Sequence, residues 1–138
     1  MLFFSILSPR SLSKWLGALV SQVDFCATLA ALTAGKPDPK TMRDSENVLP
    51  ALLGDSPVGR SHIVEHAGRL ALREGNLKFI PPGKTTEMLG PWKTAVIEPP
   101  GALFDVRADP GEKVDLASSR PEELKAMAAK LEELRKGE

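Results

Sequence analysis

The sequence predicts an α+β fold, in which N-terminal helices precede a small antiparallel β-sheet that packs against a C-terminal helix. Three observations lead to this prediction. Apolar residues recur at helical spacing near both ends of the chain. Between these regions, short stretches alternate apolar and polar residues, which is the pattern of strands with one buried face. The 11 glycines and 12 prolines cluster in the middle of the chain and indicate turns there.

The composition limits the kinds of function. With 138 residues, the chain is long enough for one domain with its own core, and a second domain is not expected. The 18 basic and 18 acidic residues cancel, so no overall field attracts nucleic acid or an anionic membrane. Aromatic residues make up 5% and tyrosine is absent, which argues against base-stacking surfaces. The single cysteine, Cys26, excludes an internal disulfide and a multi-thiolate metal site.

Residues 1–20 are a lead-in of uncertain status. Met1–Leu7 is apolar, but Arg10 and Lys14 follow this run, whereas a secretory signal places its positive charges first. The next apolar run, Trp15–Val20, is shorter than the about 20 residues of a membrane span. The sequence therefore favours an amphipathic lead-in over a signal peptide or anchor. An artefact of truncated coding sequence is a third alternative.

Ser21–Ala34 is predicted to be a helix, because apolar residues recur in it at the 3.6-residue period. Ser21 or Asp24 is expected to cap its start, and Gly35 is expected to end it. Nearly every position from Phe25 to Leu32 is apolar or small. We therefore expect this helix to be made for packing on a larger body, and to expose an apolar face when the chain is isolated. Cys26 is expected to be buried as a small hydrophobic residue.

A short second helix is predicted within Ser45–Gly54, beginning near Pro50 because proline suits the first helical turn. Three strands are then predicted, and they span His62–Ala67, Arg69–Arg73 and Leu77–Ile80. The sequence Glu74-Gly75-Asn76 between the last two is a turn signal, so these strands are expected to form an antiparallel hairpin. Pro81–Gly101 is predicted to be a loop, anchored by Trp92 and the Val96–Ile97 pair.

The stretch from Ala102 to Leu116 is predicted to contain a strand followed by a turn at Asp109-Pro110-Gly111. Val114 and Leu116 are expected to hold the chain against the core after the turn. A C-terminal helix is predicted from Ser119, which forms a capping box with Glu122. Its apolar stripe consists of Leu124, Met127, Leu131 and Leu134, and Arg135 and Lys136 lie at its negative end.

Four segments resemble, in collinear order, the C-terminal part of the sulfatase family. The first, Val20–Leu32, resembles S-x-V-D-[LI]-x-P-T-[LI]-x-x-[LA], although Ala27 replaces the proline. The second, Asp44–Gly54, resembles D-[GS]-x-[SN]-[LV]-L-P-x-L-x-G. The third, Leu72–Ile80, resembles the hairpin [LIV]-R-x-G-x-[WL]-K-[LFYI]-[IV]. The fourth resembles L-[FY]-D-x-x-x-D-P-x-E-x-x-[ND]-L and is matched by Leu103, Phe104, Asp105, Asp109, Pro110, Glu112, Asp115 and Leu116.

The resemblance implies a fold of the alkaline-phosphatase-like superfamily. Residues 21–54 would be the end of the catalytic domain and residues 55–138 the C-terminal subdomain. The family hydrolyses sulfate esters with calcium and a formylglycine made from a cysteine or serine in C/S-x-P-x-R, and its members are often exported. That motif is absent, because Cys26 is followed by Ala27-Thr28-Leu29-Ala30. We therefore expect an inactive fragment whose partner is the missing catalytic region. The alternative is a free-standing, non-catalytic binding or interaction module.

The resemblance also suggests that His66 lies at the rim of a substrate pocket, against the alternative of a structural or solvated histidine. A metal shared with His62 is not expected, because four strand residues separate the two by about 13 Å. The acids of the Ala102–Leu116 stretch are expected to cap the turn and the helix, since they lack the spacing of the calcium ligands in an EF-hand loop. A local basic set could meet a sulfated small molecule or glycan or be a solvated face; it consists of Arg69, Arg73, Lys78 and Lys84.

Overall fold

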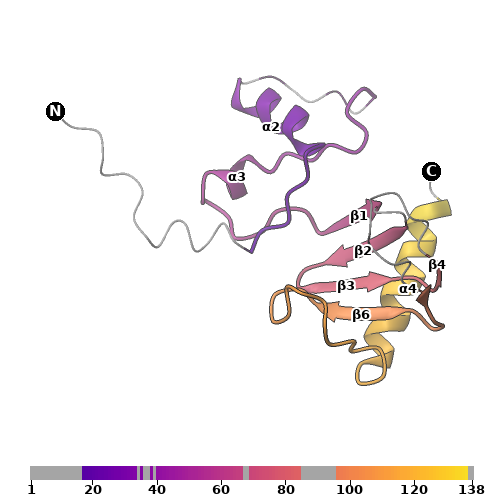
Figure 1. Cartoon of the computed structure of the whole chain (residues 1–138). Helices are drawn as coiled ribbons and strands as arrows, with labels where there is room; N and C mark the ends of the chain where they lie inside the picture. The colour runs from indigo at the N-terminus through magenta and orange to yellow at the C-terminus, as the bar shows by residue number, and fades with distance from the viewer. Residues whose placement is uncertain are drawn as a thin grey trace, which may run out of the picture. The chain divides into compact units, whose positions relative to one another are not determined.

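The computed structural model describes residues 17–33, 35, 38, 40–66, 69–84 and 96–136 (Figure 1). Its contacts divide the chain into two compact units, Met1–Ile63 and Val64–Glu138. The expectations for residues 1–16 and for Trp92 lie outside the described residues. The predicted division into residues 1–20, 21–54 and 55–138 stays a prediction.

The first unit contains the two predicted helices, α2 (Asp24–Leu32) and α3 (Leu49–Leu52). The start of α2 differs from the prediction, because Val23 occupies the N-cap position and makes no side-chain hydrogen bond there. At the other end, the N–H of Gly35 donates to the carbonyl of Ala30 over 2.8 Å, which closes the helix as predicted.

The four-stranded antiparallel sheet has the order β1-β2-β3-β6 and contains the predicted hairpin (Figure 1). In the hairpin, Arg73 pairs with Lys78 and Leu72 with Phe79, and Gly75 in the turn adopts a φ of 55°. Beyond it, β3 pairs with β6, and Phe79 lies opposite Leu103. The strands span His62–His66 in β1, Leu70–Glu74 in β2, Leu77–Ile80 in β3 and Ala102–Asp105 in β6.

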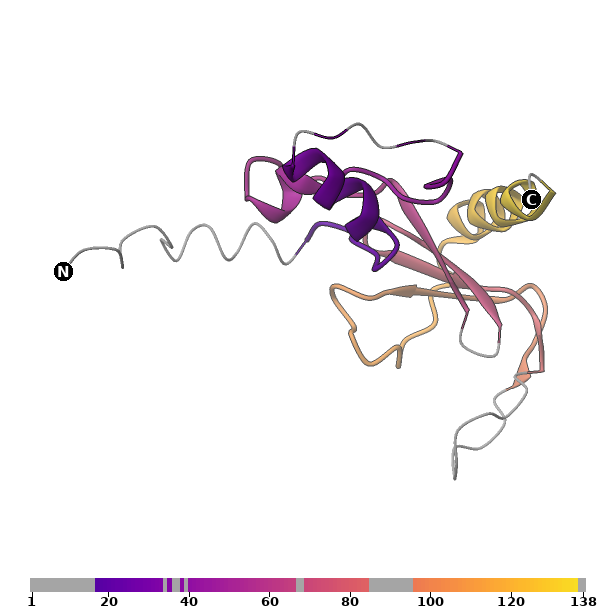
Figure 2. The ribbon, with the colours of Figure 1, turned by 90° about the horizontal axis from the view of Figure 1, so that it is seen from above.

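The C-terminal helix α4 (Pro121–Lys136) lies along one face of this sheet, as Figures 1 and 2 show. The predicted apolar stripe of the helix meets alternate residues of the strands, because side chains one position apart point to opposite faces. The buried cluster consists of Leu72, Phe79, Leu103, Leu124, Met127 and Leu131, and Leu134 packs against it. The predicted α+β fold is therefore confirmed.

Three details of the second unit differ from the sequence-based expectation. The predicted loop from residue 81 to residue 101 contains a short two-stranded ladder, in which β4 (Gly83–Lys84) pairs with β5 (Val96–Ile97). The hydroxyl of Ser119 donates to the carbonyl of Leu116 over 3.1 Å, and α4 begins at Pro121. The predicted capping box is therefore wrong.

The third difference concerns the residues expected to hold the chain against the core after the turn. Leu116 does so, since it packs against the buried cluster and its N–H donates to the carbonyl of Leu103 over 2.7 Å. Val114 does not, because 59% of its surface is exposed. Its N–H is held by the carboxylate of Asp109, which keeps Val114 within the turn.

Candidate functional site

His66, the predicted pocket-rim residue, is the exposed last residue of β1. Strand alternation places it on the same face as His62 and on the opposite face from Glu65. The Nδ1 atom of His62 lies 2.9 Å from the hydroxyl of Ser61. Within the described part of the chain, no three or more histidine, cysteine or acidic side chains are arranged to hold a metal ion. The rim role of His66 stays a prediction.

The predicted basic set contains side chains in different electrostatic states. The Nζ atom of Lys78 lies 2.7 Å from a carboxylate oxygen of Glu112 and 3.7 Å from one of Glu65, so two acids offset its charge. The guanidinium of Arg69 donates to the carbonyl of Pro81 over 3.0 Å. The Nε atom of Arg73 is buried and has no hydrogen-bond partner among the described residues. The set is thus not four equivalent cations facing solvent.

The acids of the turn after β6 mainly hold backbone groups in place. Asp109 accepts hydrogen bonds from the N–H groups of Lys113 and Val114, over 2.6 and 2.7 Å. The bond from Val114 is the main reason that the pKa of Asp109 lies below its ordinary value of 3.8. Asp105 accepts in the same way from the N–H groups two and three positions further on. The predicted structural role in the turn is confirmed for these two acids.

The other two acids of this turn connect it to the sheet. Glu112 adopts a left-handed φ of 50°, and its carboxylate pairs with Lys78 on β3. The Oδ1 atom of Asp115 accepts the N–H of Leu103 on β6 over 3.0 Å and the N–H of Ala117 over 2.8 Å. These bonds give both acids structural contacts within the second unit.

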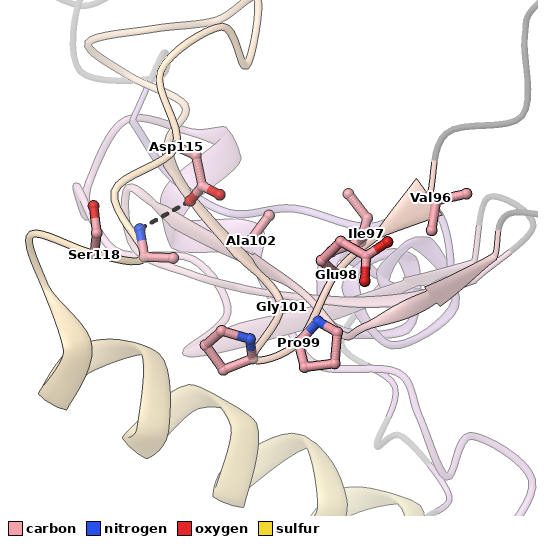
Figure 3. Close-up of a pocket in the computed structure, with 10 residues that line it drawn as sticks. Val96, Ile97, Glu98, Pro99, Gly101, Ala102, Asp115 and Ser118 are labelled. Carbon is pink, nitrogen blue, oxygen red and sulfur yellow. Dashed lines mark hydrogen bonds between the residues drawn. The ribbon is translucent and has the colours of Figure 1, made fainter.

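A pocket of about 400 Å³ lies beside this turn, between residues 96–102 and 115–118 (Figure 3). Its lining includes the rings of Pro99 and Pro100 and the carboxylates of Glu98 and Asp115. Among the described residues of the lining, both charged side chains are acidic, and these carboxylates repel an anionic group.

The first unit is organised by a buried acid, Asp24. Its carboxylate pairs with the guanidinium of Arg60 over 2.6 Å. It also accepts the N–H of Ser21 over 2.8 Å and the N–H of Glu46 over 3.0 Å. This network was not predicted, although the sequence contains a signal for it. An acid inside an otherwise apolar helix must find a cation or several N–H donors if it is buried.

Further polar contacts join α2 to the segment before α3. The N–H of Val48 donates to the hydroxyl of the buried Thr28 over 3.1 Å, and the N–H of Ala27 donates to the hydroxyl of Ser45 over 2.9 Å. The buried face of α2 is therefore formed by Asp24, Ala27 and Thr28, which are small or polar.

The large apolar side chains of α2 lie on its exposed face. Phe25 is 48% exposed, Leu29 is 56% exposed and Leu32 is 59% exposed. This confirms the expectation that the helix exposes an apolar face. Cys26 is exposed as well, so its predicted burial is wrong. The reason is that Asp24 and Thr28 occupy the inner face. In the described residues, no helix is both long and apolar enough to cross a membrane.

No protein-family model matches the chain. Over 122 residues the chain is 31% identical to an N-acetylgalactosamine-6-O-sulfatase of Bacteroides thetaiotaomicron. The aligned region covers 86% of this chain and 24% of that protein. It also matches a sulfatase structure from work on the metabolism of multiple glycosaminoglycans by Bacteroides thetaiotaomicron. The TM-score between the two structures is 0.73 and the sequence identity is 31%. The match covers 86% of this chain and 25% of the chain in that structure.

Crystal structures of Ps i-CgsB, alone and with k-i-k-neocarrahexaose, share the fold with TM-scores of 0.55 and 0.57 at 23% identity. They match 80% and 83% of this chain and 23% and 24% of the solved chains. The chain thus spans about a quarter of the length of the proteins it matches. In sequence and in fold, it corresponds to the C-terminal part of a sulfatase.

Proposed function

We propose that this chain is the non-catalytic C-terminal part of a sulfatase and serves sulfate-ester hydrolysis only together with a catalytic region outside these residues. The observation that carries the proposal is the match at 31% identity to a quarter of an N-acetylgalactosamine-6-O-sulfatase. The sequence lacks C/S-x-P-x-R, from which the family's formylglycine is expected to form. The chain would therefore complete and brace the catalytic region without supplying the nucleophile.

The residues of this chain do not fit the two groups that the family resemblance implies, calcium and formylglycine. In the frame set by Cys26, Thr28 and Ala30 stand where the formylglycine motif requires proline and arginine. The carboxylates of Asp105 and Asp109 accept backbone N–H groups. We therefore assign both groups to the catalytic region outside these residues.

For the complete protein, we propose a sulfated glycan or sulfated small molecule as the substrate class. His66 would contribute at the rim of the pocket, because an exposed imidazole can donate a hydrogen bond to an anionic oxygen. Lys78 is a weaker candidate because Glu65 and Glu112 already offset its charge.

The absence of activity can be tested on the purified chain with an aryl sulfate and calcium. We expect no turnover above the buffer rate, because the nucleophile motif is missing from the sequence. Measurable hydrolysis would show that the chain contains a catalytic site of its own. The neighbouring coding sequence supplies a second check. A C/S-x-P-x-R motif in frame or in an adjacent gene is expected for a sulfatase part.

The role of His66 can be tested in a chimera, in which this chain replaces the matched quarter of the Bacteroides N-acetylgalactosamine-6-O-sulfatase. We expect His66→Ala to raise the KM for a sulfated substrate about tenfold, which corresponds to about 1.4 kcal/mol. His62→Ala is the matched control, because His62 lies on the same strand and is partly buried. If the two substitutions change the KM equally, His66 does not lie at the rim of the substrate pocket.

A free-standing interaction module is a second candidate, and the second unit favours it. That unit has its own buried cluster, built around Phe79, Leu103 and Leu131. Such a unit does not need a larger body to bury its apolar residues. The two candidates differ in genetic context, since a module needs no adjacent sequence that encodes a sulfatase catalytic region.

A further inference from the structure

The pocket between residues 96–102 and 115–118 has the size and the mixed lining of a small-molecule site. Its volume of about 400 Å³ lies within the usual range of ligand pockets. The apolar part of the lining includes Ile97 and the rings of Pro99 and Pro100. Among the described residues, the charged part of the lining consists of Glu98 and Asp115 and contains no basic side chain. The charge of this lining therefore favours a cationic ligand.

The wall formed by residues 98–101 is held closely against the sheet. The N–H of Gly101 donates to the carbonyl of Glu98 over 2.9 Å, which closes a turn. Gly101 adopts a φ of 113°, and a Cβ atom at this position would lie 2.8 Å from the carbonyl oxygen of Ile80 and 2.8 Å from the ring of Phe79. The turn thus approaches β3 as closely as a glycine allows. This wall of the pocket is fixed by the fold before any ligand is present.

The opposite wall presents a carboxylate in a fixed orientation. The Oδ1 atom of Asp115 accepts the N–H of Leu103 over 3.0 Å and the N–H of Ala117 over 2.8 Å. Among the described residues, these hydrogen bonds leave the Oδ2 atom of Asp115 without a donor. In Figure 3, the side chains of Asp115 and Glu98 lie on either side of Ala102. Asp115 therefore offers a pre-oriented acceptor to a charged donor, and Glu98 adds a second negative charge.

We propose that this pocket binds a primary ammonium group on a short aliphatic stem, as carried by a free amine or by a lysine side chain. An ammonium group has three N–H donors and no acceptor, so it matches the oxygens of Asp115, Glu98 and Ser118 in the lining. The stem would lie on the rings of Pro99 and Pro100, where its apolar surface is removed from water. This inference goes beyond the proposed function and does not depend on it.

A titration of the isotope-labelled chain with pentylammonium, followed by NMR, tests this binding. We expect the amide signals of Gly101, Ala102 and Ala117 to shift saturably, with half-saturation at about 10 mM, because the ligand has few atoms. The amides of β2 are the internal control, since β2 contributes no residue to the described lining. Pentanoate has the opposite charge and should shift none of these signals. Methylammonium lacks the stem and should bind about fivefold more weakly than pentylammonium.

Two substitutions test the two carboxylates separately. Glu98→Gln removes the charge of an exposed side chain and should weaken binding about threefold. Asp115→Asn keeps an oxygen that can accept the N–H groups of Leu103 and Ala117, but an amide nitrogen replaces the second oxygen. Because this nitrogen donates and carries no negative charge, binding should weaken at least tenfold. Glu133→Gln is the matched control, since it removes the same charge from an exposed residue of α4 outside the described lining. Its affinity for pentylammonium should be unchanged.

The outcomes of this titration decide the inference. Shifts that do not saturate, or equal shifts with pentanoate, would overturn it. Equal affinities of the unchanged chain and Glu98→Gln would do the same, and this comparison holds even if Asp115→Asn does not fold. A peptide that contains one lysine identifies the source of the ammonium group. Tighter binding of the peptide than of pentylammonium indicates a lysine of a partner protein, and the reverse order indicates a free amine.

Discussion

The two units of this chain place their polar and apolar residues in opposite ways. The second unit buries large apolar side chains such as Leu72, Phe79 and Leu103 between its sheet and α4. The first unit buries Asp24 and Thr28 beside apolar residues such as Leu19 and Val48. It exposes Phe25, Leu29 and Leu32. Hydrophobic burial therefore stabilises the second unit, whereas hydrogen bonds and an ion pair organise the first. The two units therefore differ in how much of their large apolar surface is buried within the described residues.

The comparison also separates two kinds of internal contact. Apolar packing is non-directional and tolerates exchange among residues of similar volume. A buried carboxylate is stable only if its partners are in place, because desolvation of an unpaired charge costs several kcal/mol. The second unit should thus lose stability in proportion to the volume that is removed, while the first should respond sharply to the loss of one partner.

The largest effect is expected from Phe79→Ala, which removes a buried ring from the centre of the second unit. Truncation of a buried phenylalanine lowers the free energy of unfolding by about 3–5 kcal/mol. Urea unfolding followed by circular dichroism measures this loss. Val114→Ala is the control, because Val114 is exposed and should change little. A loss below about 1 kcal/mol for Phe79→Ala would mean that the buried cluster does not stabilise the sheet.

A somewhat smaller effect, about 3 kcal/mol, is expected from Asp24→Ala, because it leaves Arg60 and two backbone N–H groups without their acceptor. Hydrogen exchange should show the loss in α2 and at residues 44–48, with the amides of β2 and β3 unaffected. Glu46→Ala is the matched control. Glu46 also contacts Arg60, at 3.2 Å, but its side chain is 48% exposed, so the cost should stay below about 1 kcal/mol. Equal effects of the two substitutions would contradict the buried role of Asp24.

A smaller, pH-dependent effect is expected at Asp109 in the second unit. Hydrogen bonds from Val114 and Lys113 lower the pKa of Asp109 in the folded state below 3.8. The carboxylate therefore stabilises the turn above its unfolded pKa, and this contribution is lost as the pH falls through the lowered folded value. The amide NMR signals of Lys113 and Val114 should shift with a midpoint below pH 3.8. Asp109→Asn should abolish this transition, and a midpoint above pH 3.8 would contradict the lowered pKa.

The smallest effect on stability is expected from Leu32→Lys in the isolated chain. Leu32 is already 59% exposed, and surface substitutions usually change the free energy of unfolding by at most about 0.5 kcal/mol. Thermal unfolding measures the change. A loss above about 2 kcal/mol would show that the face of α2 formed by Phe25, Leu29 and Leu32 is packed within the chain, and the two units would then not differ in this respect.

Sequence periodicity predicted the elements whose two faces differ in polarity. The alternation of Leu70 and Leu72 with Arg73 placed the apolar face of β2 against the core, and the stripe of α4 was placed in the same way. Periodicity was less informative for α2, where both faces contain apolar residues. The identity of the inner face depends on Arg60, which lies 36 residues from Asp24 and leaves no local pattern. For the same reason the burial of Cys26 was predicted wrongly.

The turn after β6 shows a second limit. Its position followed from proline and glycine, but the left-handed φ of 50° falls on Glu112 rather than on Gly111. The contact between Glu112 and Lys78 accompanies this conformation, and it joins residues 34 apart in the sequence. Of the candidate site, the exposure of the apolar face of α2 was predicted, whereas the acidic pocket was not. The pocket is formed by two separate segments whose approach depends on the fold.

The bonds that Asp115 and Leu116 make with Leu103 have a consequence for self-association. β6 is the last strand of the sheet, and a terminal strand normally offers its backbone groups to a strand from another molecule. At the centre of β6 these backbone groups are already hydrogen-bonded. The N–H of Leu103 donates to the carboxylate of Asp115, and the carbonyl of Leu103 accepts the N–H of Leu116. An incoming strand would first have to break both bonds. The turn after β6 therefore protects this edge strand against fibril-like strand addition.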